Sequence, residues 1–301
     1  MTSHTLAVLL ACHNRRATTL ACLDRLRAQQ GLSDVTIQVF LVDDGSTDGT
    51  AQAVAAAHGD VEILSGSGSL FWCGAMRLAM EQAMRRGFDN YLWLNDDVQL
   101  EPQAIARMLE LHRRHERPAV LVGATRDGHS GRVSYGGYVR TSRWNRLAFK
   151  IVPPPQEQPR PVDAMNGQFV LIPHAVAAAV GNLDEKFAQN FGDFDYALRA
   201  RRRGFEVLLA PGYVGQCGHN PCGMLWREAT LPWQRRWQLV TSPRQFPPRQ
   251  LLRYARRHGG VFWPLLWLLP YVRALVLPIR HTPQALQAAR AAGAVVDVKE
   301  R

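Results

Sequence analysis

The sequence has 301 residues, of which 47% are hydrophobic and 20% are charged, and its formal net charge is +11. These values exclude a disordered chain and allow a sizeable core, in one large domain or in one domain with a substantial appendage. Only three of the 36 basic residues are lysine. A surface rich in arginine suits phosphate-bearing partners such as nucleotides, anionic lipids or nucleic acid, although a GC-rich genome would produce the same bias.

The first 125 residues alternate between strand-like and helix-like patterns. Apolar runs of buried-strand length lie at 5–12, 35–42, 61–64, 91–94 and 119–124. Helical patterns lie at 18–29 and 74–86, in the alanine-rich segment that ends at Gly59, and after Pro102. This alternation predicts an α/β fold, with a Rossmann-like and mostly parallel sheet covered by helices on both faces.

The middle of the chain is less regular. The proline-rich segment 151–161 is incompatible with a helix or a central strand. A strand at 166–173, a helix at 193–203 and a strand at 205–211 follow it. From about Trp226 the composition shifts to tryptophan, arginine and proline. We therefore expect a main domain over 1–225 and a helical, Arg/Trp-rich extension over 226–301.

The most hydrophobic run, "VFWPLLWLLPYV" at 261–272, is shorter than a membrane span and contains Pro264 and Pro270. Arginines crowd its N-terminal flank. This combination is typical of an interfacial segment that lies on an anionic membrane. A helix packed in the core of the main domain would show the same hydrophobicity, so both interpretations stay open.

The five cysteines follow no disulfide-framework spacing, which favours a reduced interior. Cys217, Cys222 and His219 could suggest a zinc site, but a second pair of ligands is missing. The N-terminus has neither a basic region nor a cleavage site before the first strand. We therefore expect the protein to work in the cytoplasm.

Acidic side chains gather at three points of the predicted fold. Asp43 and Asp44 end the second strand, Asp96 and Asp97 follow the fourth, and "GDFD", with Asp193 and Asp195, begins a helix. Ligands of an open parallel sheet bind beyond the carboxyl ends of its strands. Adjacent buried carboxylates repel each other and need a neutralising partner. The alternatives are solvated turn aspartates after the fourth strand and a helix cap at Asp193.

In combination, "LACHNR", "VFLVDDGSTDGT", "LWLNDDV" and "GDFDYALRARRRGFEV" resemble the inverting family 2 glycosyltransferases, which have the GT-A fold. The resemblance runs from about Leu6 to His219. It implies a nucleotide-binding half at 1–125 and an acceptor-side half at 126–225, where 166–187 resembles the family's acceptor segment. The loop "GSGSLFWCGAM" at 66–76 resembles that of the rhamnosyltransferase-like branch.

The resemblance also implies roles for individual residues. It makes Asp193 the general base, although the family often has Glu-Asp where this chain has Gly192-Asp193. It makes Asp97 a ligand of Mg²⁺ or Mn²⁺, which neutralises the acidic pair. The nucleotide site would comprise Ala11, His13, Asn14, Arg15, Asp43, Asp44 and Asp96. The donor and acceptor pocket would comprise Gly68, Trp72, Arg77, Asn166 and Gly167. The metal site would comprise Asp97, Asp96 and His219.

Several of these residues have a second interpretation. His219 could be structural, Arg77 could belong to a solvated helix face, and Trp72 could fill the core. Arg199 lies one helical turn after Asp195, so we expect it to pair with that carboxylate rather than with substrate.

The expected function is a metal-dependent, inverting transfer of sugar from dTDP-rhamnose or a UDP-sugar to a hydroxyl of a glycan or lipid-linked acceptor. The expected setting is surface polysaccharide synthesis on the inner face of the cytoplasmic membrane. One alternative is an Arg-rich nucleic-acid- or membrane-binding module, but no nucleic-acid-binding motif is recognisable, so we expect no nucleic-acid partner. Another is a nicotinamide dehydrogenase, whose G-x-G-x-x-G fingerprint is replaced by "CHNRRA".

Overall fold

The computed structural model describes residues 4–218, 225–277 and 279. The chain forms two compact units. The first contains Met1–Thr141 and Ala148–Gly218, and the second contains Ser142–Leu147 and His219–Arg301. Each unit is described by itself below. The predicted domain boundary at residue 225 stays a prediction.

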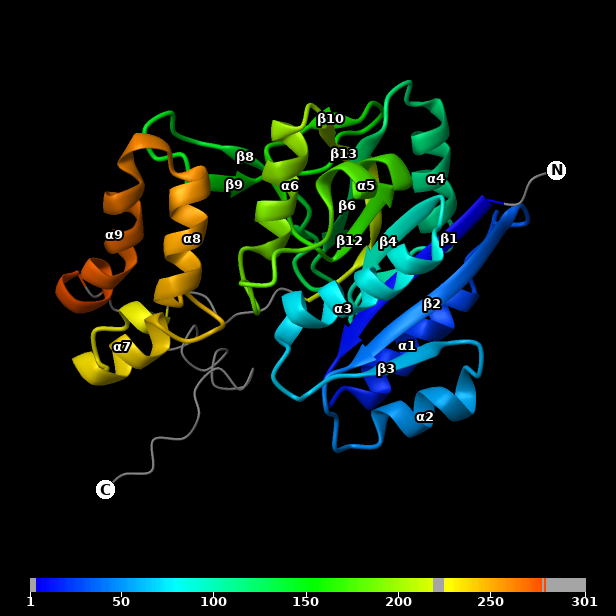
Figure 1. Ribbon diagram of the computed structural model, residues 1–301, viewed down its shortest axis with the longest axis horizontal. Helices are drawn as coiled ribbons and strands as arrows, with labels where there is room; N and C mark the ends of the chain where they lie inside the picture. The colour runs from blue at the N-terminus through cyan, green and yellow to red at the C-terminus, as the bar shows by residue number, and fades with distance from the viewer. Residues whose placement is uncertain (1–3, 219–224, 278, 280–301) are drawn as a thin grey trace. The chain divides into compact units, whose positions relative to one another are not determined.

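The first unit is built on a ten-stranded sheet whose main path runs β10-β13-β6-β12-β4-β1-β2-β3, with β5 paired to β13 and β7 paired to β6 (Figure 1). Its strands are β1 (His4–Cys12), β2 (Val35–Asp43), β3 (Glu62–Ser65), β4 (Asn90–Leu94), β5 (Gln99–Leu100), β6 (Ala119–Arg126), β7 (Val133–Tyr135), β10 (Arg160–Pro161), β12 (Phe169–Pro173) and β13 (Glu206–Gln216). Strands β3, β2, β1 and β4 are parallel, whereas β12 is antiparallel to β4 and β6. A three-stranded sheet adds β8 (Gly137–Arg140), β9 (Phe149–Ile151) and β11 (Ala164–Met165).

Helices cover both faces of the large sheet. The helices of the unit are α1 (Arg16–Arg27), α2 (Thr50–Ala57), α3 (Phe71–Arg86), α4 (Ala104–Arg114), α5 (His174–Val180) and α6 (Gly192–Arg202). Along β1, Leu6 and Val8 pack in one apolar cluster with α1, α2 and α4, while Ala7 and Leu9 pack in another with α3, α5 and α6. Successive strand side chains point to opposite faces, so each strand contributes to two cores. The predicted α/β architecture is confirmed.

The observed element ends differ from the predicted ones by a few residues. Helix α3 begins at Phe71, three residues before the predicted start, because the backbone N–H of Phe71 has a carboxylate acceptor in Asp44. Strand β13 continues to Gln216, past the predicted end at Pro211, because its pairing with β6 shifts register between Leu209 and Tyr213. The proline-rich segment contributes the last residue of β9 and the edge strand β10, where a proline removes no central ladder bond.

In the second unit the described helices are η1 (Leu225–Arg227), α7 (Trp233–Val240), α8 (Pro248–His258), η2 (Gly260–Phe262) and α9 (Trp263–Val276). Tyr271 of α9 is buried, and its hydroxyl donates to the carbonyl oxygen of Phe246 at 2.8 Å. The indole of Trp267 donates to the carbonyl oxygen of Pro248 at 3.1 Å. The apolar run of the sequence is therefore a helix with one face packed within its own unit.

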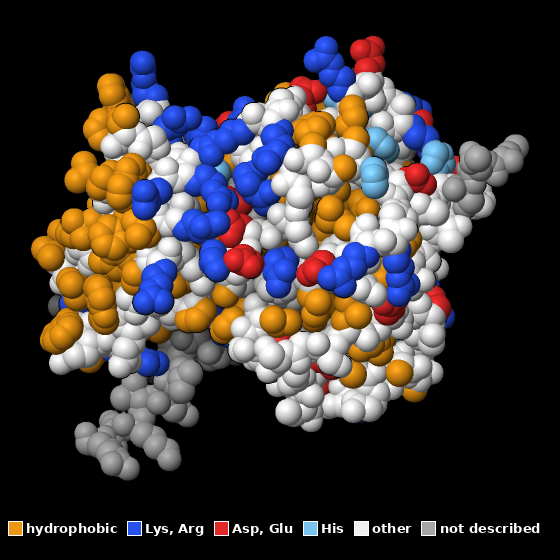
Figure 2. Space-filling model, in the orientation of Figure 1, with side chains coloured by type: hydrophobic (Ala, Val, Ile, Leu, Met, Phe, Trp, Pro, Cys, Tyr) orange, Lys and Arg blue, Asp and Glu red, His pale blue; other side chains and the backbone are white. Residues whose placement is uncertain are grey.

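The other face of α9 is exposed. Leu265 and Val276 are 64% and 69% exposed, and Leu268, Val272 and Leu275 between them are also exposed. These side chains belong to the cluster of hydrophobic groups at the left of the view in Figure 2, over α9. Within the described ranges, no helix combines the length and the apolar character that crossing a membrane requires.

Candidate active site

The loops that leave β1 and β2 are joined by hydrogen bonds at the carboxyl edge of the sheet. The amide oxygen of Asn14 accepts from the backbone N–H of Thr47 at 2.7 Å, and the N–H of Asn14 donates to the Ser46 hydroxyl at 2.9 Å. The Nδ1 atom of His13 donates to the carbonyl oxygen of Asp44 at 2.7 Å. The structure thus brings together His13, Asn14 and the acidic end of β2, as the predicted nucleotide site requires.

Both carboxylates at the end of β2 organise backbone. Asp44 accepts from the N–H groups of Gly68 and Phe71, at 2.8 and 3.0 Å, so it anchors the glycine loop to the start of α3. A Cβ atom on Gly66 would lie 2.6 Å from the Asp44 carboxylate, which explains why this position needs glycine. Asp43 accepts from the N–H of Ser46 at 2.9 Å. The predicted place of Asp44 in the nucleotide site stays a prediction.

Arg15 lies between the two carboxylates that follow β4. Its Nη1 atom donates to Oδ1 of Asp96 at 2.6 Å, and its Nη2 atom donates to Oδ2 of Asp97 at 3.0 Å. The side chain of Asp96 is 3% exposed, against 29% for Asp97 and 45% for Arg15. A guanidinium group of the protein itself therefore offsets part of the negative charge of the acidic pair.

Burial and charge act against each other in this cluster. Loss of solvent raises the pKa of Asp96 to about 6, although the positive charge of Arg15 opposes the rise. Burial by itself would lower the pKa of Arg15, but the two carboxylates outweigh it and raise that pKa above its ordinary value. Asp96 thus depends strongly on Arg15 for its ionised form near neutral pH.

Helix α1 supplies two further contacts that the sequence analysis missed. The hydroxyl of Thr19 donates to Oδ2 of Asp96 at 3.1 Å, and the thiol of Cys22 donates to the carbonyl oxygen of Asn95 at 3.5 Å. Arg15, Thr19 and Cys22 are spaced i, i+4 and i+7, which places them on one face of the helix. That spacing was a signal available in the sequence.

On the opposite side of the pair, the thiol of Cys217 lies 3.4 Å from Oδ1 of Asp97. The cysteine considered for a zinc site therefore contacts the acidic pair. Cys222 and His219, the other candidates for that site, lie outside the described residues, so the predicted role of His219 at the metal stays a prediction.

Asp193 lies in the first turn of α6, where backbone groups hold its carboxylate. Oδ2 accepts from the N–H of Gly167 at 3.1 Å, and Oδ1 accepts from the N–H of Phe194 at 2.8 Å. Loss of solvent raises the pKa of Asp193 to about 6, against the lowering effect of these bonds and of one from the Asn166 side chain. A carboxylate with this pKa is mostly ionised at neutral pH and can accept a proton.

Trp72 connects the segment of the acidic pair with that of Asp193. Its indole N–H donates to Oδ1 of Asn95 at 2.6 Å. A Cβ atom on Gly167 would lie 2.2 Å from the same indole ring, so the ring rests directly on the backbone that donates to Asp193. A similar approach occurs at Gly192, where a Cβ atom would lie 2.6 Å from the sulfur of Cys73. Glycine at 192, where the family often has glutamate, thus makes room for the start of α3.

Three non-glycine residues of the described chain have left-handed backbone conformations, and all three adjoin this region. They are Asn14, Phe71 and Phe191, with φ of 51°, 55° and 73°. Each lies where the chain enters α1, α3 or α6. Such strain persists only where the surrounding structure enforces it, and it concentrates at functional sites.

The structure shows the contacts of two arginines, Arg199 and Arg77, whose roles were predicted from the sequence. Arg199 donates to Asp195 at 2.7 Å, which confirms the expected pair, and it also donates to the carbonyl oxygens of Val180 and Asn182. Arg77 contacts Glu81 one turn further along α3, at 3.4 Å. The predicted place of Arg77 in the donor and acceptor pocket therefore stays a prediction.

The donor atoms of this region suit a hard divalent cation, because Asp96 and Asp97 present carboxylate oxygens. In the described part of the chain, no group of three or more His, Cys, Asp or Glu side chains could hold a metal ion by itself. Magnesium-type sites commonly use one or two carboxylates and complete their coordination with substrate phosphates. The residues present therefore fit a cation that arrives with a phosphate ligand.

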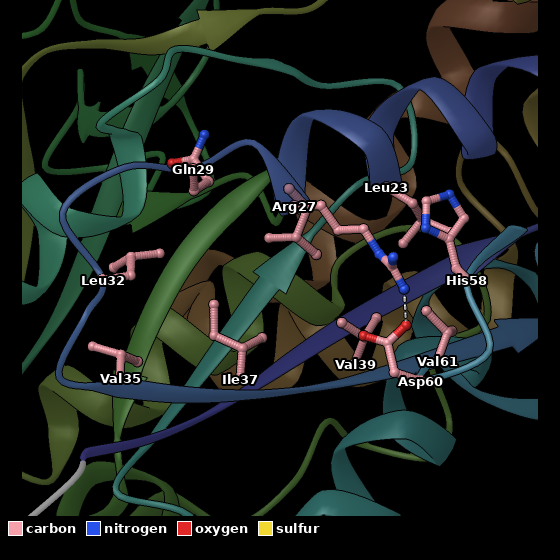
Figure 3. Close-up of a pocket in the computed structure, with 11 residues that line it drawn as sticks. Leu23, Arg27, Gln29, Leu32, Val35, Ile37, Val39, His58, Asp60 and Val61 are labelled. Atoms are coloured by element: carbon pink, nitrogen blue, oxygen red, sulfur yellow. Dashed lines mark hydrogen bonds and ion pairs between the residues drawn. The ribbon is translucent and has the colours of Figure 1, made fainter.

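A separate cavity of about 240 Å³ lies between α1 and the amino-terminal half of β2 (Figure 3). Its walls are mostly apolar, and an ion pair between Arg27 and Asp60 crosses one side of it. The cavity lies away from the carboxyl ends of the strands, where parallel sheets bind their ligands. We therefore place the active site at the acidic clusters and not at this cavity.

Comparison with solved structures identifies the fold. The chain is similar to the mannosyltransferase PcManGT from Pyrobaculum calidifontis in complex with GDP-Man and Mn²⁺, with a TM-score of 0.53 and 15% identity over 97% of this chain and 76% of that one. It is also similar to S. aureus TarS 1-349 (TM-score 0.54, 14% identity, 96% and 88% covered) and to GalNAc-T7 with UDP, GalNAc and Mn²⁺ (TM-score 0.63, 14% identity, 96% and 54% covered). The fold is the GT-A fold of glycosyltransferases, as predicted.

The family follows from the sequence comparison. The model of the family described as "Glycosyl transferase family 2" matches residues 7–164, so this chain belongs to glycosyl transferase family 2 and is a glycosyltransferase. Two curated relatives, from two strains of Mycobacterium tuberculosis, are N-acetylglucosaminyl-diphospho-decaprenol L-rhamnosyltransferases. Each is 24% identical over 214 residues, which cover 63% of this chain and 69% of the relative. These relatives confirm the resemblance to rhamnosyltransferases.

Proposed function

We propose that this protein is a metal-dependent, inverting glycosyltransferase that uses dTDP-rhamnose or a UDP-sugar as donor. The observation that carries the proposal is the acidic pair Asp96–Asp97 at the end of β4, linked through Trp72 to the segment that holds Asp193. A site that activates an acceptor hydroxyl needs a base near the place where a nucleotide-sugar is held. The rhamnosyltransferase relatives favour dTDP-rhamnose among the donors.

In this proposal the joined loops of β1 and β2 bind the nucleotide. His13, Asn14 and Asp44 form one hydrogen-bonded group, so a ligand seated there meets a preorganised surface. Ala11, Arg15, Asp43 and Asp96 complete the nucleotide site. Asp97, with Asp96 and His219, would hold Mg²⁺ or Mn²⁺, and that cation stabilises the charge of the leaving diphosphate.

Asp193 acts as the general base. Its carboxylate takes the proton of the acceptor hydroxyl while the oxygen attacks the anomeric carbon from the side opposite the diphosphate, so the configuration inverts. The N–H groups of Gly167 and Phe194 orient this carboxylate. Gly68, Trp72, Arg77, Asn166 and Gly167 form the donor and acceptor pocket of the proposal. The side chain of Asn166 favours the ionised form of this base, because its hydrogen bond lowers the pKa of the Asp193 carboxyl.

We further propose that the acceptor is a glycan or a lipid-linked glycan of surface polysaccharide synthesis, met on the inner face of the cytoplasmic membrane. The support is the exposed apolar face of α9 together with three exposed arginines of α8. These arginines, Arg249, Arg253 and Arg256, are spaced i, i+4 and i+7 and so share one helix face. Each would contribute about 1 kcal/mol near an anionic surface. No nucleic-acid partner is part of the proposal.

The donor proposal is tested by titration calorimetry of UDP, dTDP, GDP and NAD, each with and without Mn²⁺. We expect one nucleoside diphosphate to bind with Mn²⁺ and NAD not to bind. Asp97→Ala should abolish the metal-dependent part of that affinity, while Asp60→Ala, at the separate cavity, should leave it unchanged. Unchanged affinity and unchanged metal dependence in Asp97→Ala would contradict the metal assignment.

The membrane proposal is tested by flotation with vesicles. The full chain should float with anionic vesicles in a salt-sensitive way and less with neutral ones. Replacing Arg249, Arg253 and Arg256 together by glutamine should reduce that flotation. Equal flotation of the parent and the triple variant would count against an electrostatic membrane contact.

A further inference from the structure

Arg15 binds carboxylate oxygens of Asp96 and Asp97 that a divalent cation would need as ligands. One oxygen of Asp96 accepts from Arg15 and the other from Thr19. One oxygen of Asp97 accepts from Arg15 and the other lies 3.4 Å from the thiol of Cys217. All four oxygens of the pair therefore have a partner in the protein, and the guanidinium is the only positive charge among those partners.

The position of Arg15 allows it to leave. It is the last residue before α1 begins, and its side chain is 45% exposed, so the guanidinium can turn into solvent without disturbing the helix. Thr19 and Cys22 hold the segment of the acidic pair independently, through Asp96 and the backbone of Asn95. The cluster therefore keeps part of its support when Arg15 moves.

The charges determine which ligand can displace it. A divalent cation that arrives alone must separate Arg15 from both carboxylates and leave the guanidinium without an anionic partner. A cation that arrives with a nucleoside diphosphate brings phosphate oxygens, which an arginine binds in the same bidentate manner as a carboxylate. In that case Arg15 exchanges one anionic partner for another, and the exchange costs much less.

We propose that Arg15 is an internal counter-cation of Asp96 and Asp97 that exchanges with the divalent cation only when the nucleoside diphosphate arrives. The enzyme then takes up metal together with the donor and not before it. This inference rests on the proposed function, because it requires a metal-bound diphosphate, and it adds an order of binding and a second role for Arg15 as a diphosphate contact.

The exchange predicts effects of opposite sign for one substitution. In Arg15→Gln the acidic pair loses its competitor, so the affinity for Mn²⁺ alone should rise about tenfold or more. The same variant lacks the arginine that would bind the diphosphate, so the affinity for the nucleoside diphosphate in the presence of Mn²⁺ should fall about tenfold. An arginine that merely stabilised the loop would weaken both affinities on removal.

The experiment is a titration of free Mn²⁺, followed by electron paramagnetic resonance, on the full chain with and without the diphosphate identified by calorimetry. The matched control is Arg16→Gln, which removes the same charge one residue away. The side chain of Arg16 is exposed, and its backbone N–H is what contacts Asp48. This control should leave both affinities at the parent values.

If Arg15→Gln folds poorly, Arg15→Lys provides the second variant. Lysine keeps the charge but cannot bridge both carboxylates in the planar manner of arginine. The affinity of Arg15→Lys for Mn²⁺ alone should therefore be higher than that of the parent. Unfolding midpoints in chelator and in Mn²⁺ give a readout that needs no activity. Mn²⁺ should raise the midpoint more in either Arg15 variant than in the parent.

Two results would overturn the inference, and they differ. If the parent binds Mn²⁺ with the diphosphate but Arg15→Gln binds Mn²⁺ alone no better than the parent, the exchange is wrong while the metal site stands. If neither protein binds Mn²⁺ even with diphosphate, the metal assignment of the proposed function falls, and the exchange falls with it.

Discussion

Two pairs of acidic residues in the first unit, Asp96–Asp97 and Asp193–Asp195, are stabilised in different ways. In each pair one member is almost fully buried and bound by an arginine, Asp96 by Arg15 and Asp195 by Arg199. The arginines differ in what else they bind. The guanidinium of Arg199 also donates to two backbone carbonyls, and its side chain is 14% exposed. Among the described residues, the guanidinium of Arg15 donates to the two carboxylates alone, and its side chain is 45% exposed.

This comparison separates a structural ion pair from an exchangeable one. Arg199 lies one helical turn from Asp195 and links α6 to the last residue of α5 and to Asn182 after it, so its pair forms part of the packing. Arg15 lies in the loop before α1, and its guanidinium can bind water or a ligand instead of the two carboxylates. The remaining carboxylate of each pair, Asp97 or Asp193, is less buried than its neighbour. These are the two carboxylates to which we assign metal binding and base catalysis.

The largest expected effect concerns Asp193. Asp193→Asn keeps the shape of the side chain but cannot take the proton of the acceptor, so transfer at saturating donor should fall by about 10²–10⁴-fold. Donor affinity and the melting temperature should stay near the parent values, because asparagine also serves well near a helix start. The check is an initial-rate assay beside calorimetry and a thermal melt. Retained turnover in a folded variant would move the base elsewhere, with Asp195 the next candidate.

Substitution in the Arg199–Asp195 pair should change the stability of the protein rather than its rate of transfer. Asp195→Asn leaves the charge of Arg199 without its buried partner, which should lower the free energy of unfolding by about 3 kcal/mol. Urea unfolding measures this loss, and the rate per folded molecule should change far less than in Asp193→Asn. An unchanged urea midpoint would show that the Arg199–Asp195 pair contributes little, and the contrast between the two pairs would disappear.

The pH dependence sharpens the assignment of the base. A carboxylate works as a base only when ionised, and the pKa of Asp193 is about 6. Its ionised fraction falls from about 0.9 at pH 7 to about 0.1 at pH 5, so the rate at saturating donor should fall about tenfold over this range. The pKa of Asp96 is also raised to about 6, so donor affinity must be measured at each pH. A rate that stays flat down to pH 5 would contradict this role.

The smallest expected effect concerns Trp72, which links the segment of Asp96 and Asp97 to the segment of Asp193. In Gly167→Ala the new Cβ would lie 2.2 Å from the ring of Trp72, so the indole must move and its bond to Asn95 is lost. Forced overpacking of this kind costs about 1–3 kcal/mol, and transfer should fall several-fold. Gly59→Ala is the control, since the added Cβ would meet only a backbone oxygen at 4.0 Å. Equal rates for the two variants would show that Trp72 does not couple the sites.

The sequence by itself determined the α/β class and the positions of the acidic motifs. Strands buried on both faces read as continuous apolar runs, and the carboxylates that follow them mark the edge where ligands bind. The pair of Arg199 with Asp195 was also predictable, because partners one helical turn apart need no knowledge of the tertiary fold. The hydrophobicity of the 261–272 run was visible as well, although not which of its faces would be covered.

Only the tertiary structure decided which residue pairs with the carboxylates of Asp96 and Asp97. Strand β1 lies between β2 and β4 in the sheet. The loop that leaves β1 can therefore reach both neighbours, with His13 at Asp44 and Arg15 at Asp96, 81 residues further along the chain. The contacts of Trp72 with Asn95 and Gly167 arise in the same way. Spacing along a chain sets partners within one helix or strand, whereas partners between strands depend on the order of the strands, which local sequence pattern does not encode.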